Sequence, residues 1–597
     1  MEDLGSARTL VRFGAFELDQ DAGELRKQGA KIRLQEQPLQ ILQILLEQPG
    51  KVITREELRK RIWPSDTFVD FDHGINNAIK RLREALGDTA ETPDYVETLP
   101  RRGYRFIGKA APAVQADSGR IQSIAVLPME NLSRNPEQEY FADGLTEALI
   151  TSLAKVSALR VISRTTAMQY KGAHRPLPEI ARELQVDGIV EGTVLRSGER
   201  VRISAQLIEA RTDMHIWAES YERDVRDMLT LHSEVARAIA KEIQITLTPR
   251  EQMQLASSRP VDPEAYEAYL KGRHHWNRRS GDGLKKALEY FQQAIDKDST
   301  YAPAYAGLAD CAGIAGFWSF AAPAEGCGRA KMAARKALEI EETAEAHASL
   351  AWAILHYDWD LSAAEKEFQR AIELNPRYAT AHQWYGHYLG AMGRFEHAFA
   401  ELKRAIQLEP LSLIINTSYA GISWLGRQWD QAIDQTQKTL DLDPNFAAGW
   451  WARARSYEGK GMPEPAIAYS QEAIKLSGGN LFFIADLGHA YAAAGKKEDA
   501  VAVLRQLQET AKHSYVNSCF VAHIYTALNE REKALQCLEN AFRERSAWMP
   551  YLAMDPWFDS VRSDPQFEDL LRRMNFPVEI AAAAGDSRTR GLNGSGS

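Results

Sequence analysis

The sequence predicts a multidomain α+β protein in which two small domains of mixed secondary structure precede a long all-α region. Its 597 residues are about twice the length at which a single hydrophobic core stops growing. The first 250 residues alternate β-prone stretches with amphipathic helices, and from about residue 260 alanine recurs every 34 residues. With 45% hydrophobic and 26% charged residues, the composition is typical of soluble globular domains.

Charge and cysteine content exclude several classes of protein. The formal net charge of −9 argues against a surface that is basic throughout, so any nucleic-acid site must be local. The longest uncharged apolar run, 311–324, is shorter than the roughly 20 residues that span a bilayer, and the N-terminus lacks a signal-peptide pattern. Four cysteines are too few for a disulfide framework. We therefore expect a cytoplasmic protein without a membrane partner.

The N-terminal region, residues 10–108, is expected to begin with a small sheet. Three alternating stretches separated by turn-prone residues are its strands, at Val11–Leu18, Gly23–Lys27 and Lys31–Leu34. Three helices are predicted to follow, at Gln37–Gln48, from Thr54 to about Ile62, and from about His73 to Leu86. Glu57 stands three residues after Thr54, so the second helix should begin with a capping box.

The third helix has one apolar and one polar face. Its apolar stripe consists of Ile75, Ile79, Leu82 and Leu86. The opposite face carries amide and charged side chains: His73, Asn77, Lys80, Arg81 and Glu84, flanked by Asn76 and Arg83. Cationic side chains pair with guanine and asparagine with adenine in a DNA major groove. For this helix by itself, an ordinary solvated face is the alternative interpretation.

After this helix, two β-prone stretches, Tyr95–Leu99 and Tyr104–Ile107, flank a basic tip and predict a hairpin. With its sheet, three helices and basic hairpin, the whole of residues 10–108 resembles the winged helix-turn-helix effector domain of the bacterial OmpR/PhoB family. The segments that carry the resemblance are Asn76–Asp88 and Val96–Phe106. The resemblance implies that this region binds double-stranded DNA. The implied DNA-binding residues are Asn76, Asn77, Lys80, Arg81 and Arg83 on the recognition helix and Thr98, Arg101 and Arg102 on the wing.

The resemblance also has departures. Pro100 stands where response regulators often carry an arginine, so either Arg101 or Arg102 could be the wing residue that enters the minor groove. The domain holds 16 basic and 16 acidic residues, so local charge must provide its affinity. We expect neither a phospho-acceptor receiver ahead of the domain nor, in the linker 109–120, the transmembrane helix of ToxR/CadC-type relatives. We therefore expect a one-component regulator, and RNA polymerase and a second copy of the chain are further expected partners.

The pattern of residues 121–250 predicts an α/β domain. Its expected strands and helices include Ser123–Leu127, Tyr140–Val156, Leu159–Ser163, Pro178–Leu184, a hairpin of Ile189–Leu195 with Val201–Ala210, and Met228–Ile245. The segments Ser123–Pro128 and Phe141–Glu147 resemble TolB-like proteins, which implies an interaction role. Because no Walker lysine follows Gly188–Gly192, these glycines indicate tight strand packing.

Residues 260–576 contain the 34-residue period. The recurring alanines are Ala330, Ala364, Ala398, Ala432, Ala466, Ala500 and Ala534, with Ala287 as an earlier match. A second small residue follows seven positions later in most units, prolines such as Pro410 end several of them, and Gly393, Gly461 and Gly495 precede three of the alanines. The pattern resembles about eight tetratricopeptide repeats, which implies a superhelix whose groove binds a protein or peptide. The second unit carries an insertion, 313–328, and the seventh is irregular.

No catalytic motif of the serine hydrolase, zinc protease or Walker type is present. His274 and His275 are more consistent with a surface pair than with a metal site, because adjacent side chains on a helix point about 100° apart. We therefore expect no enzyme, no cofactor and no metal, and a disordered tail at 585–597. The leading hypothesis is a transcriptional regulator whose repeats receive a signal; the alternative is an interaction scaffold that does not bind DNA.

Overall fold

The structure is a computed structural model of the chain. It describes residues 9–14, 16–19, 24–27, 30–32, 34–63, 71–100, 102–108, 114–115, 121–133, 135–173, 175–198, 200–224, 228–245, 247–249, 251–252, 261–277 and 281–577. Arg101, most of the predicted linker and the predicted disordered tail lie outside these residues. The chain divides into two compact units, Met1–Arg120 and Ile121–Ser597, each with its own hydrophobic core.

The first unit opens with an antiparallel sheet. Its strands are β1 (Thr9–Phe13), β2 (Phe16–Asp19), β3 (Glu24–Lys27), β4 (Ala30–Ile32) and β8 (Val114–Gln115), in the order β4-β3-β2-β1-β8. The prediction of one strand across Val11–Leu18 is wrong. The chain reverses at Gly14, which adopts a left-handed φ of 54°, so that Val11 pairs with Leu18. Only glycine adopts this conformation without steric cost.

Three helices and a second sheet follow, as the sequence predicts for a winged helix. The helices are α1 (Glu36–Glu47), α2 (Arg55–Ile62) and α3 (Phe71–Leu86), and the strands β5 (Val52–Thr54), β6 (Val96–Leu99) and β7 (Gly103–Phe106) form a sheet in the order β5-β7-β6. The predicted capping box is confirmed: the Thr54 hydroxyl accepts from the Glu57 amide, and the Glu57 carboxylate accepts from the Thr54 amide. Phe13 packs edge-to-face on Phe106 with ring centroids 5.2 Å apart, which joins the two sheets.

The second unit begins with an α/β domain. The main strands of its sheet are β9 (Ser123–Val126), β11 (Arg160–Val161), β12 (Gly188–Ser197), β13 (Arg200–Glu209) and β14 (Met214–Asp224). They lie in the order β11-β9-β12-β13-β14, and the short strand β10 (Glu130–Asn131) pairs with β12. Helices α4 (Glu139–Ala154) and α7 (Met228–Glu242) pack with one another. Ile124 and Val126 belong to the same core cluster as these helices. Ala125 and Leu127 belong instead to a cluster with α6 (Leu177–Leu184), as expected when side chains alternate along a strand.

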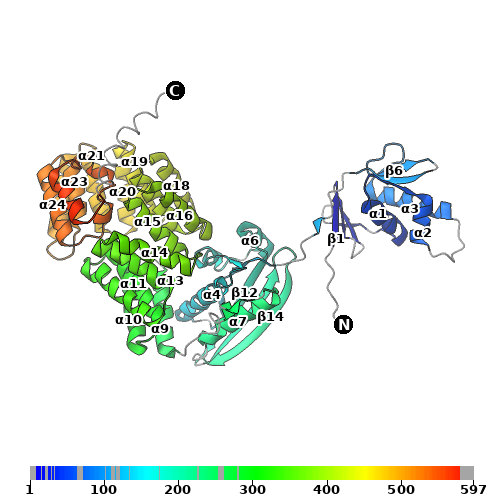
Figure 1. Cartoon of the computed structure of the whole chain (residues 1–597), viewed down its shortest axis with the longest axis horizontal. Helices are drawn as coiled ribbons and strands as arrows, with labels where there is room; N and C mark the ends of the chain where they lie inside the picture. Colours follow the sequence, from blue (N-terminus) through cyan, green and yellow to red (C-terminus); the bar gives the residue numbers. More distant parts are fainter. Residues whose placement is uncertain are drawn as a thin grey trace, which may run out of the picture. The chain divides into compact units, whose positions relative to one another are not determined.

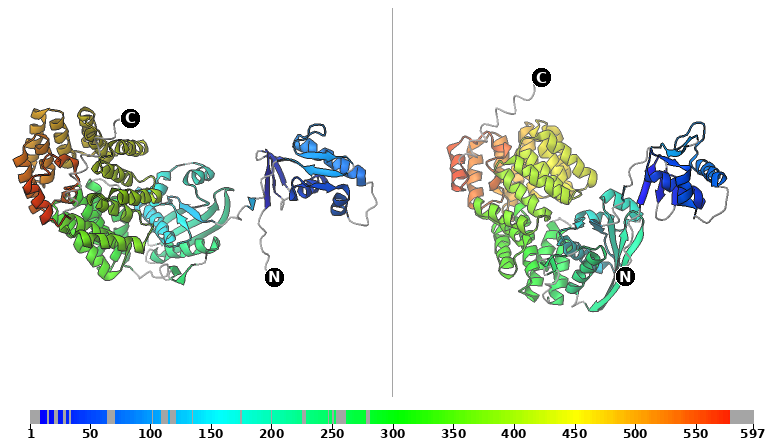
Figure 2. Two further views of the ribbon diagram at one scale, coloured as in Figure 1. Left: turned by 45° about the horizontal axis from the view of Figure 1, so that its top comes forward. Right: turned by 45° about the vertical axis from the view of Figure 1, so that its right-hand side comes forward.

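Helical hairpins occupy the rest of the unit. Among the described residues, each helix of this region pairs with the next one along the chain. The first four hairpins are α9 (Pro263–Trp276) with α10 (Gly281–Lys297), α11 (Ala302–Phe317) with α12 (Arg329–Ile340), α13 (Ala344–Ala353) with α14 (Leu361–Leu374), and α15 (Ala379–Ala391) with α16 (Phe395–Leu408). The next four are α17 (Leu413–Leu425) with α18 (Trp429–Leu442), α19 (Ala447–Gly459) with α20 (Pro463–Leu476), α21 (Leu481–Ala493) with α22 (Lys497–Thr510), and α23 (Ser518–Ala527) with α24 (Arg531–Arg543). Figures 1 and 2 show these hairpins stacked in sequence order.

The alanines of the 34-residue period lie in the second helix of each hairpin. All eight alanines of the first set, from Ala287 to Ala534, have an exposed fraction of 0%. Gly393, Gly461 and Gly495 have φ of 67°, 80° and 76°, in the left-handed region that helix-to-helix turns require. The expected tetratricopeptide architecture is confirmed, with small side chains allowing helices to approach closely.

A network of ion pairs joins the α/β domain to the first hairpin. Glu147 of α4 accepts a hydrogen bond from Nε of Arg273 of α9 at 2.7 Å and forms an ion pair with Arg164 at 3.1 Å. Burial raises the pKa of Glu147, but the charges of Arg273 and Arg164 outweigh burial and hold that pKa below its usual value. Farther along the repeats, Arg377 donates to the carbonyl oxygen of Ser157 at 2.9 Å. The α/β domain and the repeats are therefore packed as one body.

Replacing Glu147 by alanine should destabilise this body strongly. The Glu147 side chain is only 15% exposed, and its loss leaves Arg273 and Arg164 largely buried without their anion. Removing one partner of such a pair costs about 3 kcal/mol or more. We expect a clear fall in the melting temperature of the full chain by calorimetry. Glu222→Ala, which breaks an exposed pair with Arg200 and Arg202, is the control and should leave it unchanged.

Candidate nucleic-acid interface

Helix α3 is held by an apolar face. Ile75, Ile79, Leu82 and Leu86 are each at most 3% exposed, and they pack with α1 and both sheets of the first unit. The predicted stripe is therefore confirmed as the buried side of the helix. The connection before it, 64–70, lies outside the described residues.

The opposite side of α3 presents charge to solvent. Asn77, Lys80 and Arg81 are exposed, together with His73 and Glu84. Among the residues that the structure describes, Lys80 and Arg81 form no hydrogen bond or ion pair. Two cations on one helical face are thus available to an outside anion, which is the arrangement that phosphate and guanine recognition needs.

Asn76 is exposed but engaged at its amide oxygen. This oxygen accepts from the Arg55 guanidinium and from the Tyr104 hydroxyl, both at 2.9 Å. Arg55 also donates to the Tyr104 oxygen at 2.9 Å. The three side chains therefore connect the start of α2, the middle of α3 and strand β7. Asn76 can offer only its amide nitrogen to a ligand.

Arg83 differs from its neighbour Arg81 because it points to the hairpin. Its guanidinium donates to the Val96 carbonyl at 2.7 Å and to the Thr98 hydroxyl at 2.9 Å. Arg83 is half-buried, whereas Thr98 is exposed. The arginine thereby connects α3 to β6 and sets where the hairpin stands beside the helix.

Asp88 makes a second connection between α3 and the hairpin. Its carboxylate accepts from four backbone amides, those of Thr89, Asp94, Tyr95 and Val96, at 2.7 to 3.2 Å. The residue is 8% exposed, so these amides satisfy a nearly buried charge. The loop between α3 and β6 is closed around this one side chain.

The hairpin itself is short and basic at its tip. Arg102 is exposed, and its amide donates to the Leu99 carbonyl across the turn at 3.0 Å. Gly103 has a φ of 148° and lies so close to β5 that a Cβ atom would fall 2.9 Å from the Thr54 Cα. A groove of about 430 Å³ runs between helix and hairpin, with Lys80 and Arg83 among its lining residues.

The structure therefore brings most of the predicted residues to one surface but gives them different surroundings. Asn77, Lys80, Arg81 and Arg102 face solvent, while Asn76 and Arg83 already bond to the protein. Arg101 lies outside the described residues. Sequence reasoning assigned no role to Arg55, Tyr104 or Asp88. Tyr104 and Asp88 stand inside the motifs that carried the resemblance, but no sequence signal marked Arg55, whose bonds depend on tertiary packing.

The inside of the superhelix, where a peptide groove was expected, is covered by the chain itself. After α24 the chain continues through η6 (Met549–Tyr551), η7 (Pro556–Phe558) and α25 (Pro565–Arg573). Trp548 stacks on Phe317 of α11 with ring centroids 5.2 Å apart, and Trp557 stacks on His489 of α21 at 3.8 Å. Residues 546–558, which we term the C-terminal segment, thus cross the inner face of several repeats.

The remaining candidates have structural surroundings. His274 accepts or donates a hydrogen bond with Asp143 at 3.2 Å, and His275 stacks on Tyr290, so the predicted surface pair is half-buried between elements. Within the described ranges, no group of three histidine, cysteine, aspartate or glutamate residues could hold a metal ion. The described part of the chain also has no helix long and apolar enough to cross a membrane.

Three family models match parts of the chain. Residues 29–106 match "Transcriptional regulatory protein, C terminal", residues 120–241 match "HilA/YgeH-like transcriptional regulator, second domain", and residues 379–410 match "Tetratricopeptide repeat". These matches confirm that the chain carries an OmpR/PhoB-type domain, a regulator-type second domain and tetratricopeptide repeats. The likeness of the second domain to TolB-like proteins stays a prediction.

Curated relatives match different shares of the chain. "Transcriptional regulator HilA" of Salmonella typhi is 22% identical over 428 residues, which cover 70% of this chain and 74% of the relative. "Cholera toxin transcriptional activator" of Vibrio cholerae is 37% identical over 78 residues, 13% of this chain and 26% of the relative. "Putative adenylate cyclase 3" of Rhizobium meliloti is 40% identical over 186 residues, which are 31% of this chain and only 32% of the relative.

Arg83→Ala should loosen the hairpin, whereas Arg81→Ala should not. The first substitution removes two charged hydrogen bonds to β6, each worth about 1.5 kcal/mol or more, so the hairpin should open at least tenfold more often. Hydrogen exchange of peptides from 95–107, measured by mass spectrometry in the full chain, reports this opening. Equal exchange in the two variants would contradict the role assigned to Arg83.

Proposed function

We propose that this chain is a cytoplasmic, one-component transcriptional regulator that binds double-stranded promoter DNA through α3 and the β6–β7 hairpin. The observation that carries the proposal is the pair Lys80 and Arg81, which face solvent without partners among the described residues on a helix whose other face is buried. A helix of this width fits the major groove of B-DNA. The regulator-type domains that the chain shares with its relatives support the same assignment.

The predicted DNA-binding residues would divide their work. Asn77, Lys80 and Arg81 would contact base edges or phosphates in the major groove, since their side chains are exposed. Arg101 and Arg102 would reach phosphate or the minor groove from the hairpin. Asn76, Arg83 and Thr98 would mainly orient helix and hairpin, because their hydrogen bonds within the protein occupy much of their capacity.

The second unit would supply the input. Tetratricopeptide repeats generally bind proteins or peptides, and here such a partner must either displace the C-terminal segment from the inner face or bind elsewhere on the superhelix. RNA polymerase and a second copy of the chain are further partners of the proposed regulator. We assign no catalytic role to it: the relative named as an adenylate cyclase matches over only a third of its own length.

The alternative, a scaffold that does not bind DNA, makes a different prediction about salt. Binding through several phosphate contacts weakens steeply between about 50 and 200 mM salt because bound counterions are released. The affinity of a protein that docks on the same helix would depend far less on the salt concentration. The exposed cations of α3 favour the DNA-binding alternative.

The test is selection of genomic DNA fragments by the full chain at two salt concentrations. Wild type should enrich a shared motif, and the double variant Lys80→Ala/Arg81→Ala should lose about 10-fold to 100-fold in affinity, with a salt slope lower by about 1 for each phosphate contact removed. Lys475→Ala, which removes an exposed cation from α20, should behave as wild type. Equal, weak retention of DNA by wild type and the double variant would refute recognition through α3.

A further inference from the structure

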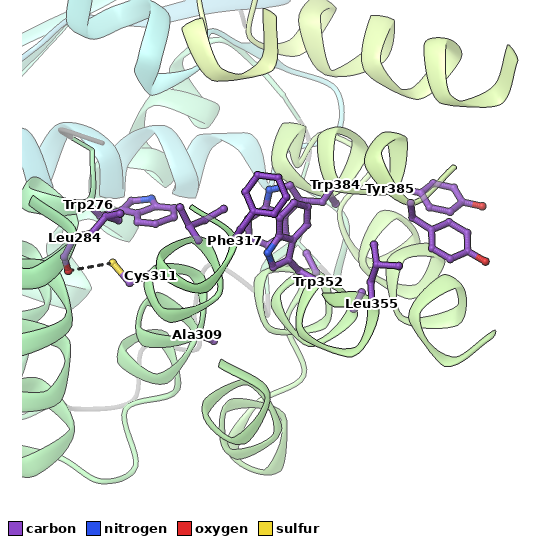
Figure 3. Close-up of a cluster of buried hydrophobic side chains, with 14 of the residues drawn as sticks. Trp276, Leu284, Ala309, Cys311, Phe317, Trp352, Leu355, Trp384 and Tyr385 are labelled. Atoms are coloured by element: carbon purple, nitrogen blue, oxygen red, sulfur yellow. Dashed lines mark hydrogen bonds between the residues drawn. The ribbon is translucent and has the colours of Figure 1, made fainter. Parts of the chain in front are cut away.

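The helical hairpins contact one another mainly in chain order. Most contacts between their helices join a helix to the next one along the chain or to the one after it. The inner face repeats this order, since Phe317 of α11 contacts Trp352 of α13 at 5.2 Å and Trp352 contacts Trp384 of α15 at 4.9 Å, as Figure 3 shows. An array held only by such contacts can open at a few hairpins while the others stay folded.

The C-terminal segment departs from this order at Trp548. The Trp548 ring stacks on Phe317 of the second hairpin at 5.2 Å and contacts Phe482 of the seventh at 5.1 Å. Phe520 of the eighth hairpin lies 5.6 Å from the same ring. Trp318, which follows α11, reaches Phe482 as well, at 5.5 Å. Trp548 therefore lies at a junction of hairpins whose residues are about 200 positions apart in the chain.

Tyr551 extends these contacts to the third and fourth hairpins. Its hydroxyl lies 3.2 Å from Nε2 of His356, which is in η5 (Ile354–Asp358) between α13 and α14. The same hydroxyl lies 3.2 Å from Nδ1 of His387 in α15. One phenol group is therefore hydrogen-bonded to two successive hairpins at once.

The remaining hairpins are reached through Trp557 and Arg455. Trp557 contacts Trp424 of α17 at 5.3 Å and stacks on His489 of α21 at 3.8 Å. The Arg455 guanidinium of α19 lies 4.3 Å from the centre of the Trp557 ring. With the contacts of Trp548 and Tyr551, the C-terminal segment thus touches every hairpin from the second to the eighth.

This segment belongs to the core of the superhelix. Of residues 546–558, all but Pro556 are buried. Even its one carboxylate is satisfied there, because Asp555 is 2% exposed and pairs with His523 of α23 at 3.0 Å. The segment cannot leave the inner face without exposing several large aromatic side chains to water, so it stays docked while the repeats are folded.

We propose that the C-terminal segment acts as a strap that joins hairpins two to eight into one cooperative unit. Opening any of these hairpins breaks contacts with a segment on which the others also pack, so they open together. As long as the strap is docked, the inner face is closed to a partner peptide. The strap does not depend on DNA binding, and it is tested in the absence of DNA.

The experiment makes a cavity at one end of the unit and reads its effect at the other. Phe368→Ala removes a fully buried ring from α14 of the third hairpin. The readout is hydrogen exchange of the slowest peptides of α21 and α23 in the full chain, measured by mass spectrometry. We expect this exchange to become about 10-fold faster or more, because the hairpins open together. Peptides of α15, where Tyr385 contacts Phe368 at 5.8 Å, verify that the cavity loosens its own surroundings.

The same cavity is then made in a chain with a weakened strap, Trp548→Ala/Tyr551→Ala. There, Phe368→Ala should accelerate exchange in α21 and α23 by less than about a third as much. Phe291→Ala, which removes an equally buried ring from α10 of the first hairpin, is the control background and should preserve the full effect. If circular dichroism shows that the strap variant has lost helix, Trp548→Leu/Tyr551→Leu replaces it. Unchanged exchange of α21 and α23 in Phe368→Ala, or equal acceleration with the weakened strap, would overturn the proposal.

Discussion

The interior of the superhelix depends on one buried ion pair, that of Arg455 with Asp486. Their side chains are 3% and 4% exposed, and the Trp451 indole donates to the same carboxylate at 2.6 Å. The guanidinium lies between 4.3 and 5.2 Å from the rings of Trp424, Trp451, Phe482, Trp548 and Trp557. A cation can stay in such surroundings only if it is paired and its donors are used. The pair therefore requires that α19, α21 and the C-terminal segment remain together, and it brings their aromatic rings around one guanidinium.

Much of the fold could be predicted because periodic patterns report local geometry. Spacing alone identifies the alanines 34 residues apart, and they are buried because the same position of every repeat packs against a neighbouring helix. The apolar stripe of α3 and the Thr54 capping box depend on residues within one or two turns of a helix, so the sequence displays them directly. Strand β14 was missed, since most of its side chains are exposed and its polar composition hides the alternation.

The contacts that organise the sites could not be predicted in the same way. Arg81 and Arg83 are both arginines on one helix, yet only Arg83 reaches β6, because the hairpin stands on that side. Nothing in the sequence separates their roles before the hairpin is placed. The sequence predicts a continuous strand across Gly14 for a related reason: both halves alternate, and only the register shows that Val11 pairs with Leu18. The filled inner face depends on contacts between residues about 230 positions apart, such as Phe317 and Trp548.

The two units have separate hydrophobic cores. The core around α3 extends from Val11 to Phe106, and the core of the second unit begins at Ile121. The α/β domain, in contrast, is joined to the repeats through Glu147 and Arg273 and must follow them. A partner that moves the repeats would therefore move the α/β domain with them.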